Sequence, residues 1–355
     1  MSNQNLARRT AVEVAFSGVD ITKSIRPYLK AFTYTDNEAD KADDIQIQLH
    51  DRDSIWMEKW LVEAIEAASA AKLKMDAVIV RENWRGDGKD IVLPCGESEL
   101  DNVVLSGPPA TITIKGTSLP FSAPVRQTKK NNDWENITLS AIARELAGAN
   151  GMSCMYESAY DPFYKRVEQR QASDIEFLSR LSHDAGISLK ATNSIIVLFD
   201  QATYEAKPPV ITIQKGKAGG YIKYKMDVGA ADSQYSSCRV SYVDPESGKC
   251  IEATAKIEDY NADAKNNQQL EITAKVSSKD EAKTLAEKHL RLHNKYSKSA
   301  TFTFPGNPAL VAGVTVELKG WGAFDGKYII TQAVHTVGGS GYTTQIKLRR
   351  VLEGY

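Results

Sequence analysis

The sequence predicts a mainly β protein of the α+β class, in which strand-rich segments at both ends flank a smaller segment with helices. Alternating apolar and polar residues recur near both ends, and glycine or proline bounds most of these short runs. In the middle of the chain, apolar residues follow helical spacing beside capping signals. The length of 355 residues exceeds what one ordinary core supports, so two or three domains are expected.

The first domain is predicted to cover residues 1–116. The segments AVEVAF at Ala11–Phe16 and DDIQIQLHD at Asp43–Asp51 alternate apolar and polar side chains, which is typical of strands with one exposed face. Further short strands follow. Between residues 55 and 73 the apolar side chains recur every three to four positions, which predicts a helix inserted into the first domain.

The second domain, residues 117–206, is predicted to combine helices with a hairpin. The segment from residue 135 to 152 is typical of a helix of about three turns. Ser173 and Glu176 then form a capping box, because the hydroxyl and carboxylate can each accept a backbone amide at the start of a helix. Gly186 is placed to end that helix, and a hairpin is expected after it.

The third domain is predicted to cover residues 207–355, after a linker that contains two prolines. Most of it is typical of strands, and one helix is expected at about residues 279–295, preceded by a second capping box. The glycines at 216, 219 and 220 lack the Lys-Ser/Thr pair and the helix that a phosphate loop requires, so they predict a hairpin turn.

Composition and charge exclude several classes of protein. The 44 basic and 45 acidic residues give a net charge of −1, so the chain has no global attraction for nucleic acid or for anionic lipid. No stretch approaches about 18 apolar residues, and no signal-peptide core follows the N-terminus, so a soluble protein that folds in the cytoplasm is expected. Cys95, Cys154, Cys238 and Cys250 lack metal-binding spacing and are expected to be free thiols, although Cys238 and Cys250 could approach each other on neighbouring strands.

No catalytic or metal-binding motif is found, so we expect neither an enzyme nor a cofactor. His289 and His293 have the i, i+4 spacing of metal ligands, but the adjacent glutamate and the third ligand of a metalloprotease are missing. Neighbouring carboxylates such as Asp43 and Asp44 are too ordinary to indicate a hydrolase. The basic pair Arg349-Arg350 is expected in a loop or at an interface.

Three segments resemble a known family. Residues 171–200, QASDIEFLSRLSHDAGISLKATNSIIVLFD, resemble a stretch of the late control gene D proteins of contractile phages and of the hub portion of type VI secretion spike proteins. Residues 304–350, with FPGNP, GVTVELKG and DGKYII, are similar to the closing pattern of this family, and residues 18–56 are similar to its opening. The three segments occur in the family's order.

This resemblance implies a non-enzymatic baseplate hub that forms a homotrimer. Each subunit would carry two tube-like antiparallel β-barrel or sandwich domains, so that a trimer presents pseudo-sixfold symmetry to a hexameric tail tube and threefold symmetry to a central spike. The implied partners are the tail tube protein, the spike protein and other baseplate proteins, with DNA only in passage through the lumen and no stable membrane insertion. Because the chain ends at Tyr355, a separate spike protein is expected.

Aromatic residues are the candidates for contacts between proteins, because aromatic side chains are enriched at interfaces. The interface candidates are Trp56, Trp60, Trp321, Phe324 and Tyr342. Two alternatives stay open: a tail-associated peptidoglycan hydrolase, and a receptor- or glycan-binding tail protein that would use Trp84 and Trp321. The expected location is the baseplate of a virion or tail particle, with assembly in the host cytoplasm. The sequence leaves open whether that particle is a phage, a bacteriocin or a secretion system.

Overall fold

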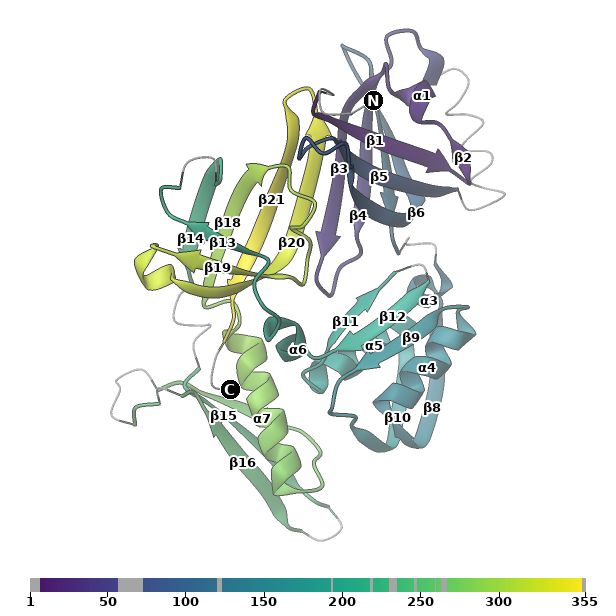
Figure 1. Cartoon of the computed structure of the whole chain (residues 1–355). Helices are drawn as coiled ribbons and strands as arrows, with labels where there is room; N and C mark the ends of the chain where they lie inside the picture. The colour runs from purple at the N-terminus through teal and green to yellow at the C-terminus, as the bar shows by residue number, and fades with distance from the viewer. Residues whose placement is uncertain are drawn as a thin grey trace.

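The computed structural model confirms the mainly β class with antiparallel sheets (Figure 1). It describes residues 7–56, 73–119, 123–192, 194–217, 220–229, 235–245, 248–258, 260–262 and 267–352. The helix expected at residues 55–73 lies almost wholly outside the described residues. Among the helices that the structure describes, none is long and apolar enough to cross a membrane.

The N-terminal β module is built from seven strands and the short helix α1 (Thr22–Ile25). Its strands are β1 (Arg9–Phe16), β2 (Val19–Asp20), β3 (Leu29–Asn37), β4 (Asp44–His50), β5 (Lys74–Glu82), β6 (Ile91–Ser106) and β7 (Thr111–Thr117). The alternation expected from the sequence is present, since every second side chain of β4 is buried. These side chains form one core with those of β1, β3, β5 and β7.

The C-terminal β module contains six strands. They are β13 (Ile211–Gln214), β14 (Lys223–Val228), β18 (Lys298–Pro305), β19 (Thr315–Lys319), β20 (Gly326–Gly338) and β21 (Gly341–Arg350). The hairpin expected at glycines 216–220 is wrong: β13 pairs in parallel with β19, whereas β14 pairs with β18. The two strands that flank these glycines therefore pair with different partner strands and not with each other.

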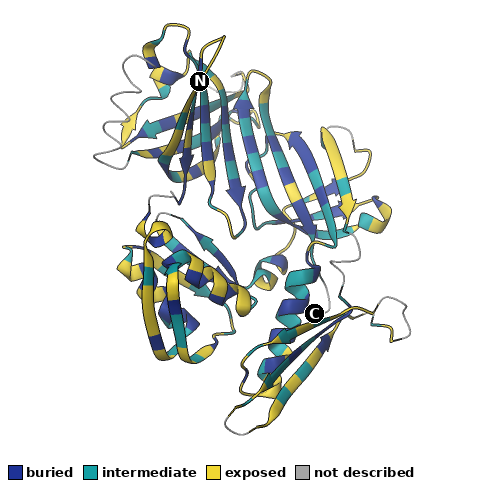
Figure 2. Cartoon of the chain, turned by 180° about the vertical axis from the view of Figure 1, so that it is seen from behind, coloured by how far each residue is buried: buried dark blue, intermediate teal, exposed yellow. Residues whose placement is uncertain are grey.

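The two β modules share one thirteen-stranded sheet, because β3 of the first pairs with β20 of the second. The antiparallel register runs from Asn37 opposite Gln332 to Ala31 opposite Gly338, and the two strands lie side by side at the centre of the molecule (Figure 1). The sheet path runs β14-β18-β21-β20-β3-β4-β7-β6-β5-β1-β2. Figure 2 shows rows of buried residues along its central strands.

The α+β unit lies below the N-terminal module in Figure 1 and has its own core. Its elements are α3 (Pro124–Gln127), β8 (Lys129–Thr138), α4 (Leu139–Ala149), β9 (Ser153–Glu157), β10 (Phe163–Ser173), α5 (Asp174–Asp184), β11 (Ser188–Ala191), β12 (Ile195–Phe199) and α6 (Gln201–Glu205). The capping box of Ser173 and Glu176, the left-handed Gly186 and the β11–β12 hairpin are confirmed. The earlier helix starts later than expected, because Ile137 still belongs to β8.

A fourth unit, which the sequence did not separate from the third domain, packs helix α7 (Lys279–Asn294) on a three-stranded sheet. Its strands are β15 (Ser237–Val243), β16 (Cys250–Lys256) and β17 (Gln269–Thr273). The helix expected at 279–295 is confirmed. Cys238 and Cys250 stand on neighbouring strands but at opposite ends of them, and both are free thiols.

Candidate functional site

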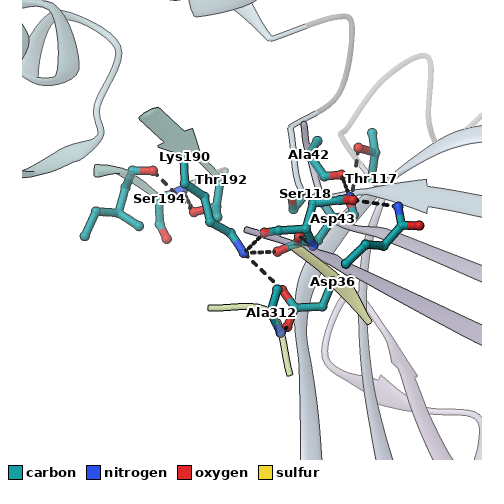
Figure 3. Close-up of polar contacts among 12 residues, drawn as sticks. Asp36, Ala42, Asp43, Thr117, Ser118, Lys190, Thr192, Ser194 and Ala312 are labelled. Carbon is teal, nitrogen blue, oxygen red and sulfur yellow. Dashed lines mark hydrogen bonds and ion pairs between the residues drawn. The ribbon is translucent and has the colours of Figure 1, made fainter. Parts of the chain in front are cut away.

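The first junction between units is centred on Lys190, which β11 of the α+β unit points toward the N-terminal module (Figure 3). Its Nζ lies 3.1 Å from Asp36 Oδ1 and 3.1 Å from Asp43 Oδ2, and donates to the Asn37 carbonyl at 2.7 Å. The second oxygen of Asp36 accepts the amide of Ala312 at 2.8 Å. Asp36 therefore joins the α+β unit to both β modules.

Two buried carboxylates share the single ammonium at this Lys190 junction. Burial raises the pKa of Asp43, despite the nearby charge of Lys190 and the amide of Asn37 that its carboxylate accepts at 2.8 Å. Burial acts to lower the pKa of Lys190, but the charges of Asp36 and Asp43 outweigh it and raise that pKa above its usual value. The junction is therefore held by charge in a partly dehydrated setting.

A second junction is centred on Arg349, at the end of β21. Its side chain is 1% exposed and donates from Nη1 to Glu205 Oε1 at 2.6 Å and from Nη2 to Glu38 Oε1 at 3.2 Å. Arg291 of α7 also pairs with Glu205. Arg349 lies in β21 and not in a loop, and it is buried at a junction between units of its own chain, where these two carboxylates compensate its charge.

Helix α7 makes further contacts with the α+β unit. Lys288 pairs with Asp200, and the ring of His289 contacts the Asp184 carbonyl through Nε2 at 3.0 Å. Burial lowers the pKa of His289. His289 thus packs between the two units, whereas the ring of His293 contacts Tyr235 within its own unit. No group of three or more metal-ligating side chains occurs in the described part of the chain.

Two of the predicted interface residues lie together in the C-terminal module. Trp321 is buried, packs against Tyr221, Tyr224 and Phe302, and donates from Nε1 to the Ile213 carbonyl at 2.9 Å. Phe324 is half-buried against the same core. Trp321 is therefore part of the core of the C-terminal module. An interface role for Trp321 and Phe324 stays a prediction.

Two further predicted interface residues, Trp56 and Tyr342, pack against a different core from that of Trp321. Trp56 is buried in the N-terminal module, edge-on to Tyr28, and Trp60 lies outside the described residues. Tyr342 is half-buried and its hydroxyl lies 2.8 Å from Nδ1 of His335. The structure thus does not gather the four described candidates on one surface.

Within the described residues, β14 and β2 end the main path of the large sheet, and β13, which pairs only with β19, is a further edge strand. At one end β14 carries Tyr224 and Val228, which are 50% and 57% exposed. At the other end β2 carries Val19, which is 65% exposed. Exposed edge strands with apolar side chains favour pairing with another chain.

Sequence reasoning missed the residues of both junctions. Asp43 stands in an ordinary run of carboxylates, and nothing in the local pattern distinguishes Lys190 from a surface lysine. Their partners are remote in the sequence, so only the folded chain identifies them.

The arrangement of β modules is that of phage tail proteins. The tail protein of Neisseria meningitidis MC58 has a similar structure, with a TM-score of 0.69 and 11% identity over 96% of this chain and 97% of that one. A component of the type VI secretion system of E. coli, described as similar to the T4 bacteriophage tail proteins gp27 and gp5, matches with a TM-score of 0.54 and 11% identity over 99% of this chain and 77% of its own.

The sequence model of one family matches residues 120–341, and the chain belongs to that family, phage tail baseplate hub (GPD). A probable baseplate hub protein of Escherichia phage P2 is 26% identical over 202 residues, which cover 55% of this chain and 48% of that relative. The chain thus spans about half the length of the curated relative that it matches. The resemblance read from the sequence is confirmed at the level of the family.

Proposed function

We propose that this chain is a structural hub of a contractile tail baseplate, and that it works as a homotrimer. The observation that carries the proposal is the single sheet in which two β modules stand side by side, joined at β3 and β20. One subunit supplies two modules, so three subunits supply six. A threefold assembly can thereby present a nearly sixfold ring.

The partners follow from this symmetry. A hexameric tail tube protein would dock on the ring, a central spike protein would dock on the threefold side, and other baseplate proteins would surround it. The near-zero net charge supports a lumen through which DNA passes without binding strongly. Assembly would take place in the host cytoplasm before the particle is complete.

The proposed contacts between subunits lie at the ends of the sheet. The exposed apolar side chains of β14 at one end and of β2 at the other suit pairing between copies. The predicted interface residue Trp321 packs against Tyr224 of β14, and Phe324 packs against the same core. We keep the division into domains 1–116, 117–206 and 207–355 as part of the proposal, with the α7 unit as an appendage of the third.

We further propose that the chain is not an enzyme. Hub relatives are structural proteins, and the charged side chains brought together in this fold are paired across junctions. The hydrolase alternative would need a cleft with a reactive carboxylate. The glycan-binding alternative would need exposed aromatic rings, whereas Trp321 is buried.

The test is the solution mass by light scattering, followed by negative-stain imaging. We expect three times 39.1 kDa, about 117 kDa, and ring-shaped particles. Val228→Lys on β14 should lower the mass toward a monomer, whereas Val243→Lys on β15, equally exposed, should leave it unchanged.

A monomer that degrades cell-wall material would contradict the hub and favour the hydrolase. An inert monomer would next be mixed with the tube and spike proteins of the same particle. Failure to bind either would also contradict the proposal.

A further inference from the structure

Arg81 is a buried cation at the end of a core-facing row of β5. Met75, Ala77 and Ile79 point into the core of the N-terminal module, and Arg81 continues the row with only 7% of its surface exposed. Its guanidinium stacks on Trp84, with the carbon 3.7 Å from the ring centroid. Cation–π contact offsets only part of the cost of burying a charge.

The guanidinium has no carboxylate partner within the described part of the chain. Its Nε is buried without a hydrogen-bond partner, and burial lowers the pKa of Arg81. Natural proteins seldom leave a buried charge uncompensated, so we expect a group from another molecule to pair with the charge of Arg81.

Arg81 lines a cavity of about 410 Å³ where the two β modules meet. The opposite wall comes from β13, from Lys217, Gly220 and Tyr221 after it, and from the end of β18 with the two residues that follow. Lys217 adds a second cation, Ile213 and Phe304 add apolar surface, and none of the described residues that line the cavity is acidic. The cavity is larger than a single small anion needs.

We propose that this cavity is a socket for an acidic side chain of a docking protein, whose carboxylate pairs with Arg81. Cations beside apolar side chains match a carboxylate on a short aliphatic stem, as in glutamate. A guanidinium held by Trp84 is ordered before the ligand arrives, which lowers the entropic cost of binding. The identity of the docking protein as another baseplate component rests on the proposed function, whereas the carboxylate chemistry does not.

The chemistry is tested on the isolated chain with sodium propionate, which has the stem and carboxylate of a glutamate side chain. Propionate should raise the melting temperature saturably, by about 1–3 °C relative to sodium chloride at equal ionic strength. The rise should vanish in Arg81→Gln and persist in Arg81→Lys, which keeps the charge. Without propionate, Arg81→Gln should be at least as stable as the wild type, because it removes an unpaired buried charge.

Three outcomes would overturn the proposal: no rise in the wild type, an equal rise in Arg81→Gln, or a larger saturable rise with inorganic phosphate, which would identify a small-oxyanion site.

The docking protein is tested by assembly of the chain with tube and spike proteins. Arg81→Gln should speed dissociation of the complex at least tenfold, whereas Arg85→Gln, an exposed neighbour, should not. An unchanged complex would overturn the docking role. If the wild type forms no complex, the proposed function fails, and the propionate result still decides the carboxylate chemistry.

Discussion

The two β modules and the α+β unit are attached to the same strand by different kinds of interaction. The modules are joined by continuous backbone pairing of β3 with β20. The α+β unit meets the end of β3 and the loop after it through the ion pairs of Lys190 with Asp36 and Asp43, together with one backbone hydrogen bond from the Asp40 amide to the Leu189 carbonyl at 2.9 Å. Backbone pairing fixes register and orientation over a whole strand. Side-chain ion pairs fix one point and depend on protonation. The shared sheet therefore fixes how the two β modules are oriented, whereas ion pairs between side chains help to hold the α+β unit against it.

The largest expected effect comes from the Arg349 junction. Arg349→Met should lower the free energy of unfolding by about 3–5 kcal/mol, because Glu38 and Glu205 stay buried after the cation is removed. Urea denaturation measures the loss. Lys347→Met, an exposed position of the same strand, should change it by less than about 0.5 kcal/mol. Equal effects would mean that charge does not hold this junction.

The stability of the β3–β20 pairing should also depend on pH, so the pH dependence would not be confined to the ion pairs of the α+β unit. His335 of β20 stands opposite Tyr34 of β3, and burial lowers the pKa of His335 to about 4. Below pH 6.5 the unfolded chain takes up a proton that the folded chain excludes, so stability is lost as pH falls from 6.5 toward 4. The loss from this group at pH 5 is about 2 kcal/mol.

Urea midpoints at pH 7 and pH 5 test this effect of His335. The fall should shrink in His335→Gln, with a remainder from other groups such as His289, whose pKa burial also lowers. A variant that loses as much stability as the wild type on acidification would contradict the assignment.

The smallest expected effect comes from the Lys190 junction, whose lysine side chain is 24% exposed. Lys190→Met should lower the free energy of unfolding by about 1–2 kcal/mol at pH 7. The loss should be smaller at acidic pH, because protonation relieves the unpaired carboxylates; Asp43 already has a raised pKa in the wild type.

Lys41→Met, an exposed lysine on the loop after β3, is the matched control for Lys190. A loss in Lys190→Met that is independent of pH would indicate that packing of the side chain, not its charge, holds the α+β unit in place.

Local patterns predicted much of the fold. Ser173 and Glu176 marked the start of α5, Gly186 marked its end, and the alternation in β4 gave its buried face. The glycine-rich turn after residue 214 was misread, because a turn sequence does not state which strand its neighbours will join. The separate α7 unit was missed for the same reason.

The resemblance to the family predicted that the chain has interfaces with other proteins, but it did not predict which residues form them. The aromatic interface candidates rested on a general preference, and the structure places Trp321 and Trp56 inside different cores. Arg349 looked like a surface charge because its neighbour Arg350 is also basic. Its two carboxylate partners lie 144 and 311 positions away in the chain.

The sequence by itself determined the class of the fold, its capped helices, its alternating strands and the family, because these depend on residues close together in the chain. The tertiary structure alone decided that β3 pairs with β20, that Lys190 meets Asp36 and Asp43, and that Arg81 is buried without an acidic partner among the described residues. Pairings between residues that are remote in the chain depend on how whole elements pack, so a local sequence pattern does not predict them.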